Sequence, residues 1–122
     1  MAKRHLEMTI QRHLVTWCRA RCSVLRGIFS IPNESNRGAI MTALMKQAGL
    51  TPGWPDLGVP LSGGRVFWLE LKTKQGRLSD NQKKVHAMLR ELGHDVTTAY
   101  GFDAAKAVLQ DLEYAEGGKD GK

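Results

Sequence analysis

The feature that most limits the possible folds is an eight-residue run, Arg65–Lys72, which contains Val, Phe and Trp. This composition is typical of a buried strand. Ser62-Gly63-Gly64 precedes it and indicates a hairpin turn, with a weaker strand candidate over residues 57–61 on the other side. Glu70 and Lys72 lie two residues apart, so their side chains point to the same face with Cα atoms about 6.5–7 Å apart. We therefore expect the chemistry of this protein at the end of this strand.

The rest of the chain alternates between helical and extended patterns. Apolar residues that recur every three or four positions, with turn residues between the segments, give the following elements. We expect helices over residues 3–21, 37–48, 79–92 and 103–112, with Asp103 as a helix cap, and strands over residues 24–31 and 96–100. Strands interleaved with helices predict an α/β domain in which both faces of the sheet are covered.

The length of the chain predicts the number of domains, and its charge predicts the class of partner. The 122 residues are enough for one domain, which we place at residues 1–114, with a disordered tail over residues 115–122. Residues 1–50 carry 8 basic and 2 acidic side chains, whereas residues 51–122 carry 10 of each. The net charge of +6 thus lies entirely in the N-terminal part and suggests an anionic partner.

Several other classes of protein are not expected. Apolar runs fall far short of the roughly 18–20 residues that a membrane-spanning helix needs, so we expect no membrane association. Polar residues from Glu7 onward interrupt any signal-peptide core, which predicts a cytoplasmic location. Cys18 and Cys22 are too few for a disulfide framework, and the scattered histidines do not supply the four ligands of a structural zinc site.

Asp56, Glu70 and Lys72 form the group of residues that could carry chemistry. If the hairpin places Asp56 beside Glu70, two carboxylates converge where Mg²⁺ could bind with several retained waters. The carbonyl of Leu71 could add a third protein ligand, and Lys72 could orient a water or stabilise charge on a phosphate. The alternative is that Glu70 and Lys72 form an exposed ion pair on an edge strand, and that Asp56 only begins a turn.

The order of four short motifs resembles a known family. The motifs are Pro32-Asn33-Glu34, Gly53-Trp54-Pro55-Asp56, Glu70-Leu71-Lys72 and Leu78-Ser79-x-x-Gln82. Together they resemble the VRR-NUC family, a virus-type replication-repair branch of the PD-(D/E)xK nucleases, from Glu7 to about Leu109. The resemblance implies a restriction-endonuclease-like fold, with a central mixed β-sheet flanked by α-helices, and DNA cleavage that depends on Mg²⁺ or Mn²⁺. Gly58 and Pro60 depart from the continuous apolar strand that is typical of the family after the aspartate.

The resemblance also implies roles for individual residues. Asp56 and Glu70 would bind the metal together with the carbonyl of Leu71, and Lys72 would be the catalytic lysine. Gln82 matches the glutamine that follows the core motif.

Some of these positions have structural alternatives. Gln82 could equally complete a capping box with Ser79. Glu7 matches the N-terminal acidic position of the family and could bind metal, although a glutamate on an amphipathic helix usually faces solvent. Asn33 and Glu34 could simply build a turn.

The remaining expectations concern DNA. The residues expected to contact its backbone are Arg4, Arg12, Arg19, Arg37, Lys74, Arg77 and Lys83. Small stand-alone members of the family resemble Holliday junction resolvases and act as homodimers, so the chain is expected to cut branched DNA, such as a four-way junction, as a homodimer of phage or bacterial origin. The alternatives are a nicking or flap nuclease on other DNA substrates and a DNA-binding module without catalysis.

Overall fold

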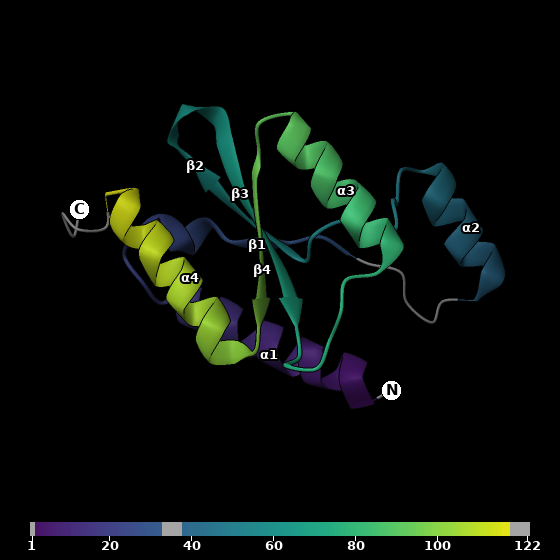
Figure 1. The fold of residues 1–122 in the computed structure, drawn as a ribbon, viewed down its shortest axis with the longest axis horizontal. Coiled ribbons are helices and arrows are strands. Elements are labelled where there is room, and N and C mark those ends of the chain that lie inside the picture. Colours follow the sequence, from purple (N-terminus) through teal and green to yellow (C-terminus); the bar gives the residue numbers. More distant parts are fainter. Residues whose placement is uncertain (1, 33–37, 118–122) are drawn as a thin grey trace.

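The computed structural model describes residues 2–32 and 38–117, with residues 2–5 in backbone only. Figure 1 shows a single sheet with helices packed on both sides. The elements in chain order are α1 (Ala2–Arg19), the 3-10 turn η1 (Val24–Gly27), β1 (Phe29–Ser30), α2 (Ala39–Gln47), β2 (Leu57–Leu61), the 3-10 turn η2 (Ser62–Gly64), β3 (Arg65–Lys72), α3 (Asp80–Glu91), β4 (Asp95–Tyr100) and α4 (Phe102–Ala115). The predicted alternation of helices and strands is confirmed.

The sheet has the strand order β1-β2-β3-β4, and its directions are mixed. β2 and β3 form the expected antiparallel hairpin, in which Leu57 lies opposite Leu69. β4 runs parallel to β3 after the α3 crossover, with Thr98 opposite Glu70. The mixed α/β sheet is therefore confirmed, and β3 is an interior strand.

Each face of the sheet has its own apolar core. One core gathers buried side chains of α1, η1 and α4 against β2 and β3, including Leu69 and Leu71. The other core packs Val85 and Leu89 of α3 against Trp68. Because successive side chains of a strand alternate between faces, Glu70 lies on the same face as Trp68, under α3. The prediction that both faces are covered is confirmed.

The strand expected over residues 24–31 is mostly wrong. Residues Val24–Gly27 form a 3-10 turn, and only Phe29–Ser30 pair with β2. Ser23 starts the turn, because its hydroxyl accepts a hydrogen bond from the backbone N–H of Leu25 at 3.2 Å. Leu25 is fully buried as a result, so its apolar character reflects core packing and not strand pairing.

The last helix does not begin as expected either. Gly101, with φ of 95°, holds the N-cap position of α4, and its N–H donates to the carbonyl of Lys72 at 2.8 Å. Asp103 instead lies in the first helical turn, where its charge favours the helix dipole. At the other end α4 stops at Ala115 and Glu116 pairs with Arg65, whereas residues 118–122 are outside the described residues. The disorder expected for Ala115 and Glu116 is therefore wrong, and disorder of residues 118–122 remains a prediction.

Helix α2 differs from the others in its packing. It contains no buried residue, and Ile40, Met41 and Leu44 are among its exposed apolar side chains. In Figure 1 it lies at the far side of α3 from α4. Across the described residues, none of the helices has the length and apolar character needed to cross a bilayer.

Candidate functional site

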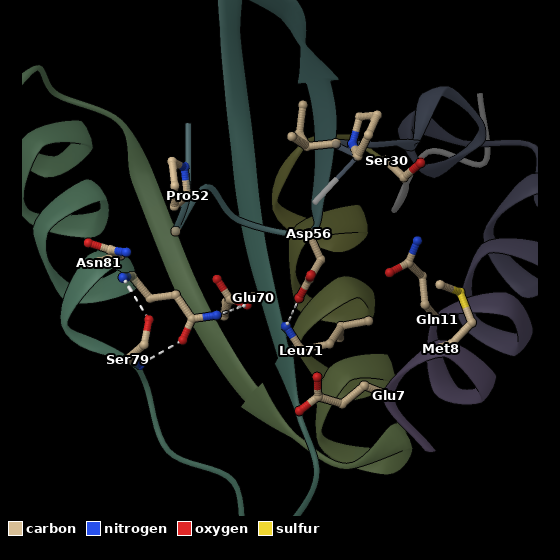
Figure 2. Close-up of a pocket in the computed structure, with 14 residues that line it drawn as sticks. Glu7, Met8, Gln11, Ser30, Pro52, Asp56, Glu70, Leu71, Ser79 and Asn81 are labelled. Carbon is tan, nitrogen blue, oxygen red and sulfur yellow. Dashed lines mark hydrogen bonds between the residues drawn. The ribbon is translucent and has the colours of Figure 1, made fainter. Parts of the chain in front are cut away.

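A cavity of about 630 Å³ opens where the C-terminal end of β3 meets the first turn of α3. Figure 2 shows Asp56 and Glu70 from the strand region beside it, Glu7 and Gln11 from α1 on one side, and Ser79 and Asn81 from α3 on the other. Residues from α1, from the β2 and β3 region and from the start of α3 thus surround one opening. Asp56, Glu70 and Glu7 bring three carboxylates to it.

Hydrogen bonds from two segments of the chain hold Asp56 in place. Its backbone carbonyl accepts from the N–H of Ile31 at 2.9 Å, and its carboxylate accepts from the backbone N–H of Leu71 at 2.7 Å. Continuing the β2–β3 register by one residue places Asp56 opposite Glu70. The hairpin therefore brings the two carboxylates together, as the spacing predicts. Leu71 contacts Asp56 through its backbone N–H, and the expected role of its carbonyl as a metal ligand stays a prediction.

Glu70 is almost completely buried, with 1% of its surface exposed. One carboxylate oxygen, Oε2, accepts a hydrogen bond from Nε2 of Gln82 at 3.1 Å. The other oxygen, Oε1, lies 3.1 Å from Nε2 of His86. Both partners come from α3, so this helix fixes the orientation of the Glu70 carboxylate.

Burial is the main reason that the pKa of Glu70 is raised to about 9. The charge of Asp56, a hydrogen bond with Asp56 and the charge of Glu7 raise it further, whereas the charge of Lys72 lowers it. A carboxylate buried beside two others is unfavourable unless a cation is present. The electrostatics of the cavity therefore favour a bound positive charge.

Gln82 completes the expected capping box and also contacts Glu70. The hydroxyl of Ser79 accepts from the N–H of Gln82 at 3.1 Å, and the Gln82 side-chain oxygen accepts from the N–H of Ser79 at 2.8 Å, which completes a capping box. Because its oxygen faces Ser79, its amide nitrogen is free to donate to Glu70. The capping box therefore orients the amide toward the cavity.

The residues around the cavity fit a divalent cation. Glu7 lines the cavity, and its Oε2 atom is buried and has no hydrogen-bond partner among the described residues. Carboxylate oxygens are the protein ligands that Mg²⁺ and Mn²⁺ prefer. Among the described residues, no group of three or more His, Cys, Asp and Glu side chains is arranged to hold a metal ion. The carboxylates at the cavity suit an ion that keeps several water or phosphate oxygens as ligands.

Lys72 is 8% exposed and lies on an interior strand, on the same face as Glu70. The alternative of an exposed ion pair on an edge strand is therefore wrong. Lys72 is not among the residues that line the cavity, and a Cβ atom added at Gly76 would lie 3.2 Å from its Cβ, so the following loop covers its stem. Its charge is still close enough to influence the pKa of both Glu70 and His86.

His86 is the site residue that sequence reasoning missed. It is 1% exposed, and burial lowers its pKa first, followed by the nearby charge of Arg90. The available signal was its position four residues after Gln82, because residues i and i+4 share one face of a helix. A glutamine and a histidine at this spacing, opposite a strand glutamate, form one hydrogen-bonded group.

Gly53 allows α3 to approach the cavity closely. Its φ is 94°, and a Cβ atom there would lie 2.5 Å from the backbone carbonyl carbon of Asn81. A side chain at this position would push the first turn of α3 away from the loop that carries Asp56. The Gly-Trp-Pro-Asp motif thus also serves to pack this loop against the helix N-terminus.

The residues expected to contact DNA fall into two groups. Lys74, Arg77 and Lys83 line a second depression of about 530 Å³ together with Tyr100, so the structure brings these three together. Arg12 and Arg19 are exposed on α1. Arg19 lies twelve residues, or about 18 Å, along the helix from Glu7.

Four other predicted positions have no described side chain. The side chain of Arg4 is outside the described part of the molecule. Arg37, Asn33 and Glu34 lie outside the described residues altogether. Their expected roles remain predictions.

Comparisons with known proteins agree with the observed fold. Residues 1–103 match the family model described as the VRR-NUC domain. A solved structure described as a VRR_NUC domain protein superposes with a TM-score of 0.71 at 22% identity, over 85% of this chain and 84% of that chain, which shows a shared fold. A comparison with curated proteins finds no match. With the family model covering most of its length, this chain belongs to the VRR-NUC family of nucleases.

Proposed function

We propose that this protein is a divalent-metal-dependent endonuclease that hydrolyses phosphodiester bonds in branched DNA, with Mg²⁺ or Mn²⁺ as cofactor. The observation that carries the proposal is the convergence of Asp56 and Glu70 at one cavity, with Glu7 opposite them. A cation bound there would polarise a phosphate oxygen and make a bound water more acidic.

The chain's own residues prepare the site for this chemistry. Asp56 and Glu70 would bind the cation, and Gln82 keeps one oxygen of Glu70 in a fixed direction. Lys72 would balance negative charge that develops on the phosphate during attack by water, since its ammonium already acts on the Glu70 carboxylate through space. Glu7 would bind the cation directly or through water with its buried Oε2 atom, which has no hydrogen-bond partner within the described part of the chain.

The DNA path in this proposal runs across the basic depression. Lys74, Arg77 and Lys83 would contact backbone phosphates beside the cut, because the depression begins in the loop that follows β3. Backbone contacts carry no base sequence, so selectivity would arise from the shape of the DNA.

Resolution of four-way junctions by a homodimer is the specific activity that we propose. Two-fold symmetry would present two cavities to a nearly symmetric junction. The exposed apolar side chains of α2 support association with a second copy, since such side chains gathered together on a surface mark protein contacts.

The proposal is tested by cleavage of matched four-way, flap, splayed and linear DNA with Mg²⁺, with Mn²⁺ and with a chelator. Paired symmetric nicks in the four-way junction are expected, and they should disappear with the chelator. Preferred cutting of flaps or nicked duplex would replace the junction assignment by the flap or nicking alternative. Binding of all four DNAs without cleavage under any of these conditions would favour a DNA-binding module without catalysis.

A further inference from the structure

Helix α3 holds the Glu70 carboxylate at both of its oxygens, and the second contact has no assigned role. Gln82 donates to Oε2, and Nε2 of His86 lies 3.1 Å from Oε1. We infer that His86 is a positioning residue, which donates a hydrogen bond to Glu70 and fixes the carboxylate for cation binding. This inference rests on the proposed function, since it concerns the affinity of the same cavity for a divalent cation.

The direction of the hydrogen bond follows from the chemistry of the two groups. A carboxylate that binds a cation is ionised, and an ionised carboxylate can only accept hydrogen bonds. Nε2 of His86 must then carry the hydrogen, which leaves Nδ1 without one in the neutral ring. Both oxygens are restrained from the α3 side, and the carboxylate lies beside Asp56 at the cavity.

A role in packing alone does not explain a histidine here. The ring is 1% exposed, and its Nδ1 atom is buried without a hydrogen-bond partner among the described residues. Burying an unsatisfied polar atom costs free energy, which a leucine of similar size would avoid. The recorded polar contact of this ring is the one with Glu70, so that contact offsets the cost.

Two substitutions separate positioning from packing. His86→Leu keeps much of the volume and removes the donor. His86→Gln keeps a donor, because the amide nitrogen of glutamine reaches about as far along the side chain as Nε2 of histidine. His94→Leu is the matched control, because His94 contacts the edge of Trp68 at a ring distance of 6.4 Å and is not among the residues lining the cavity.

The experiment is calorimetric titration of each folded variant with Mn²⁺ alone, in the absence of DNA. Loss of an outer hydrogen bond to a metal ligand typically weakens metal binding 10–100-fold. We expect His86→Leu to bind Mn²⁺ at least about 10-fold more weakly than the wild type. His86→Gln should recover most of this loss, and His94→Leu should bind like the wild type.

Cleavage assays give a second readout. In His86→Leu, higher Mn²⁺ concentrations should restore most of kcat without changing KM for DNA, since the cation site is weakened and the DNA surface is intact. If His86→Leu does not fold, the comparison uses His86→Gln and His86→Asn. The shorter asparagine cannot place a donor at the Nε2 position, so it should bind Mn²⁺ more weakly than the glutamine variant.

The inference is wrong if His86→Leu binds Mn²⁺ like the wild type, or if His86→Leu and His94→Leu weaken binding equally. It is also wrong if the glutamine and asparagine variants of His86 do not differ. A failure of the proposed function would look different. In that case the wild type itself would neither bind Mn²⁺ nor cleave DNA, and both the function and the role of His86 would be withdrawn.

Discussion

The carboxylate of Asp56 accepts a hydrogen bond from the backbone N–H of Leu71 at 2.7 Å. The backbone pairing of β2 with β3 ends at Leu57 opposite Leu69. Beyond this point, the side chain of Asp56 provides the hydrogen-bond acceptor for the next part of β3. A residue proposed to bind a cation therefore also closes the end of the hairpin. Its chemical and structural contributions can be separated by substitution.

We expect Asp56→Asn and Asp56→Ala to lower the cleavage rate by at least about 100-fold, because both remove a charge at the reacting centre. Only the alanine variant also loses the acceptor for Leu71, which should destabilise it by about 1–3 kcal/mol. Single-turnover cleavage and thermal unfolding of both variants check this. Full activity of Asp56→Asn would contradict the assignment of Asp56 as a metal ligand.

The raised pKa of Glu70 predicts how stability depends on pH when no cation is present. Its pKa is about 9 in the folded chain, against an ordinary value of 4.5, so the folded state holds a proton that the unfolded state releases above pH 4.5. The stabilising contribution is complete below about pH 4.5 and falls as the pH rises to about 9. The loss should be on the order of a few kcal/mol.

Urea unfolding between pH 5 and 9 in a chelator measures this loss. Glu70→Gln has no proton to release at this position, so its stability should decrease less over the same range. Added Mn²⁺ should restore the wild type at high pH and leave Glu70→Gln nearly unchanged. Parallel curves for the two proteins in the chelator would show that Glu70 is ionised in the folded state at neutral pH.

Gly53→Ala should destabilise the fold and weaken cleavage together. The added Cβ atom would lie 2.5 Å from backbone atoms of Asn81, and the φ of 94° is itself unfavourable for alanine. Gly63→Ala is the matched control, because its φ is 77° and the nearest recorded atom is the Nε of Arg65 at 3.8 Å. Both variants should lose about 1–2 kcal/mol from backbone strain.

Gly53→Ala should lose more stability than Gly63→Ala, and only Gly53→Ala should lose activity, because it displaces the first turn of α3. Thermal unfolding and cleavage rates measure the two effects. Equal effects of the two variants would show that the close approach to Asn81 does not matter for the site.

Arg77→Ala should weaken binding to every DNA shape by a similar factor. A phosphate contact contributes to affinity through counterion release, so the slope of log affinity against log salt should decrease by about 1. Arg77→Lys keeps the charge and should keep the slope. Fluorescence anisotropy over a salt series measures this, and an unchanged slope in Arg77→Ala would remove this residue from the DNA path.

Ile40→Glu combined with Leu44→Glu should convert the expected dimer into a monomer with a nearly unchanged melting temperature. Both side chains are exposed, and α2 contains no buried residue, so the fold does not depend on them. Light scattering after gel filtration measures the mass. A wild-type monomer at micromolar concentration would contradict the homodimer directly.

The sequence predicted the elements whose signals are local. The hairpin and β3 followed from strand composition and a Ser-Gly-Gly turn, and the boundaries of β3 were correct. The start of α3 followed from the Ser79 cap. Most of residues 24–31 were assigned wrongly, because a buried apolar run has the same composition whether it pairs in a sheet or packs as a turn against the core.

In the candidate site, too, some contacts were predictable from the sequence and others were not. Strand periodicity and the hairpin were enough to bring Asp56 beside Glu70, and the capping box was enough to place Gln82. The contact of His86 with Glu70 was not predictable, because it depends on how α3 crosses over β3. Sequence spacing relates residues within one element, whereas a crossing angle is set by packing between elements.

The sequence by itself determined which residues share a strand face, where α3 starts and that an α/β sheet would form, because these properties depend on neighbours along the chain. Only the tertiary structure decided that Glu70 is buried with 1% exposure, that α3 holds both of its oxygens and that Glu7 reaches the same cavity. The raised pKa of Glu70 also depends on the tertiary structure. It arises because packing of other elements against β3 removes water from the carboxyl group. The charges of Asp56 and Glu7, which lie 14 and 63 positions earlier in the chain, raise the pKa further.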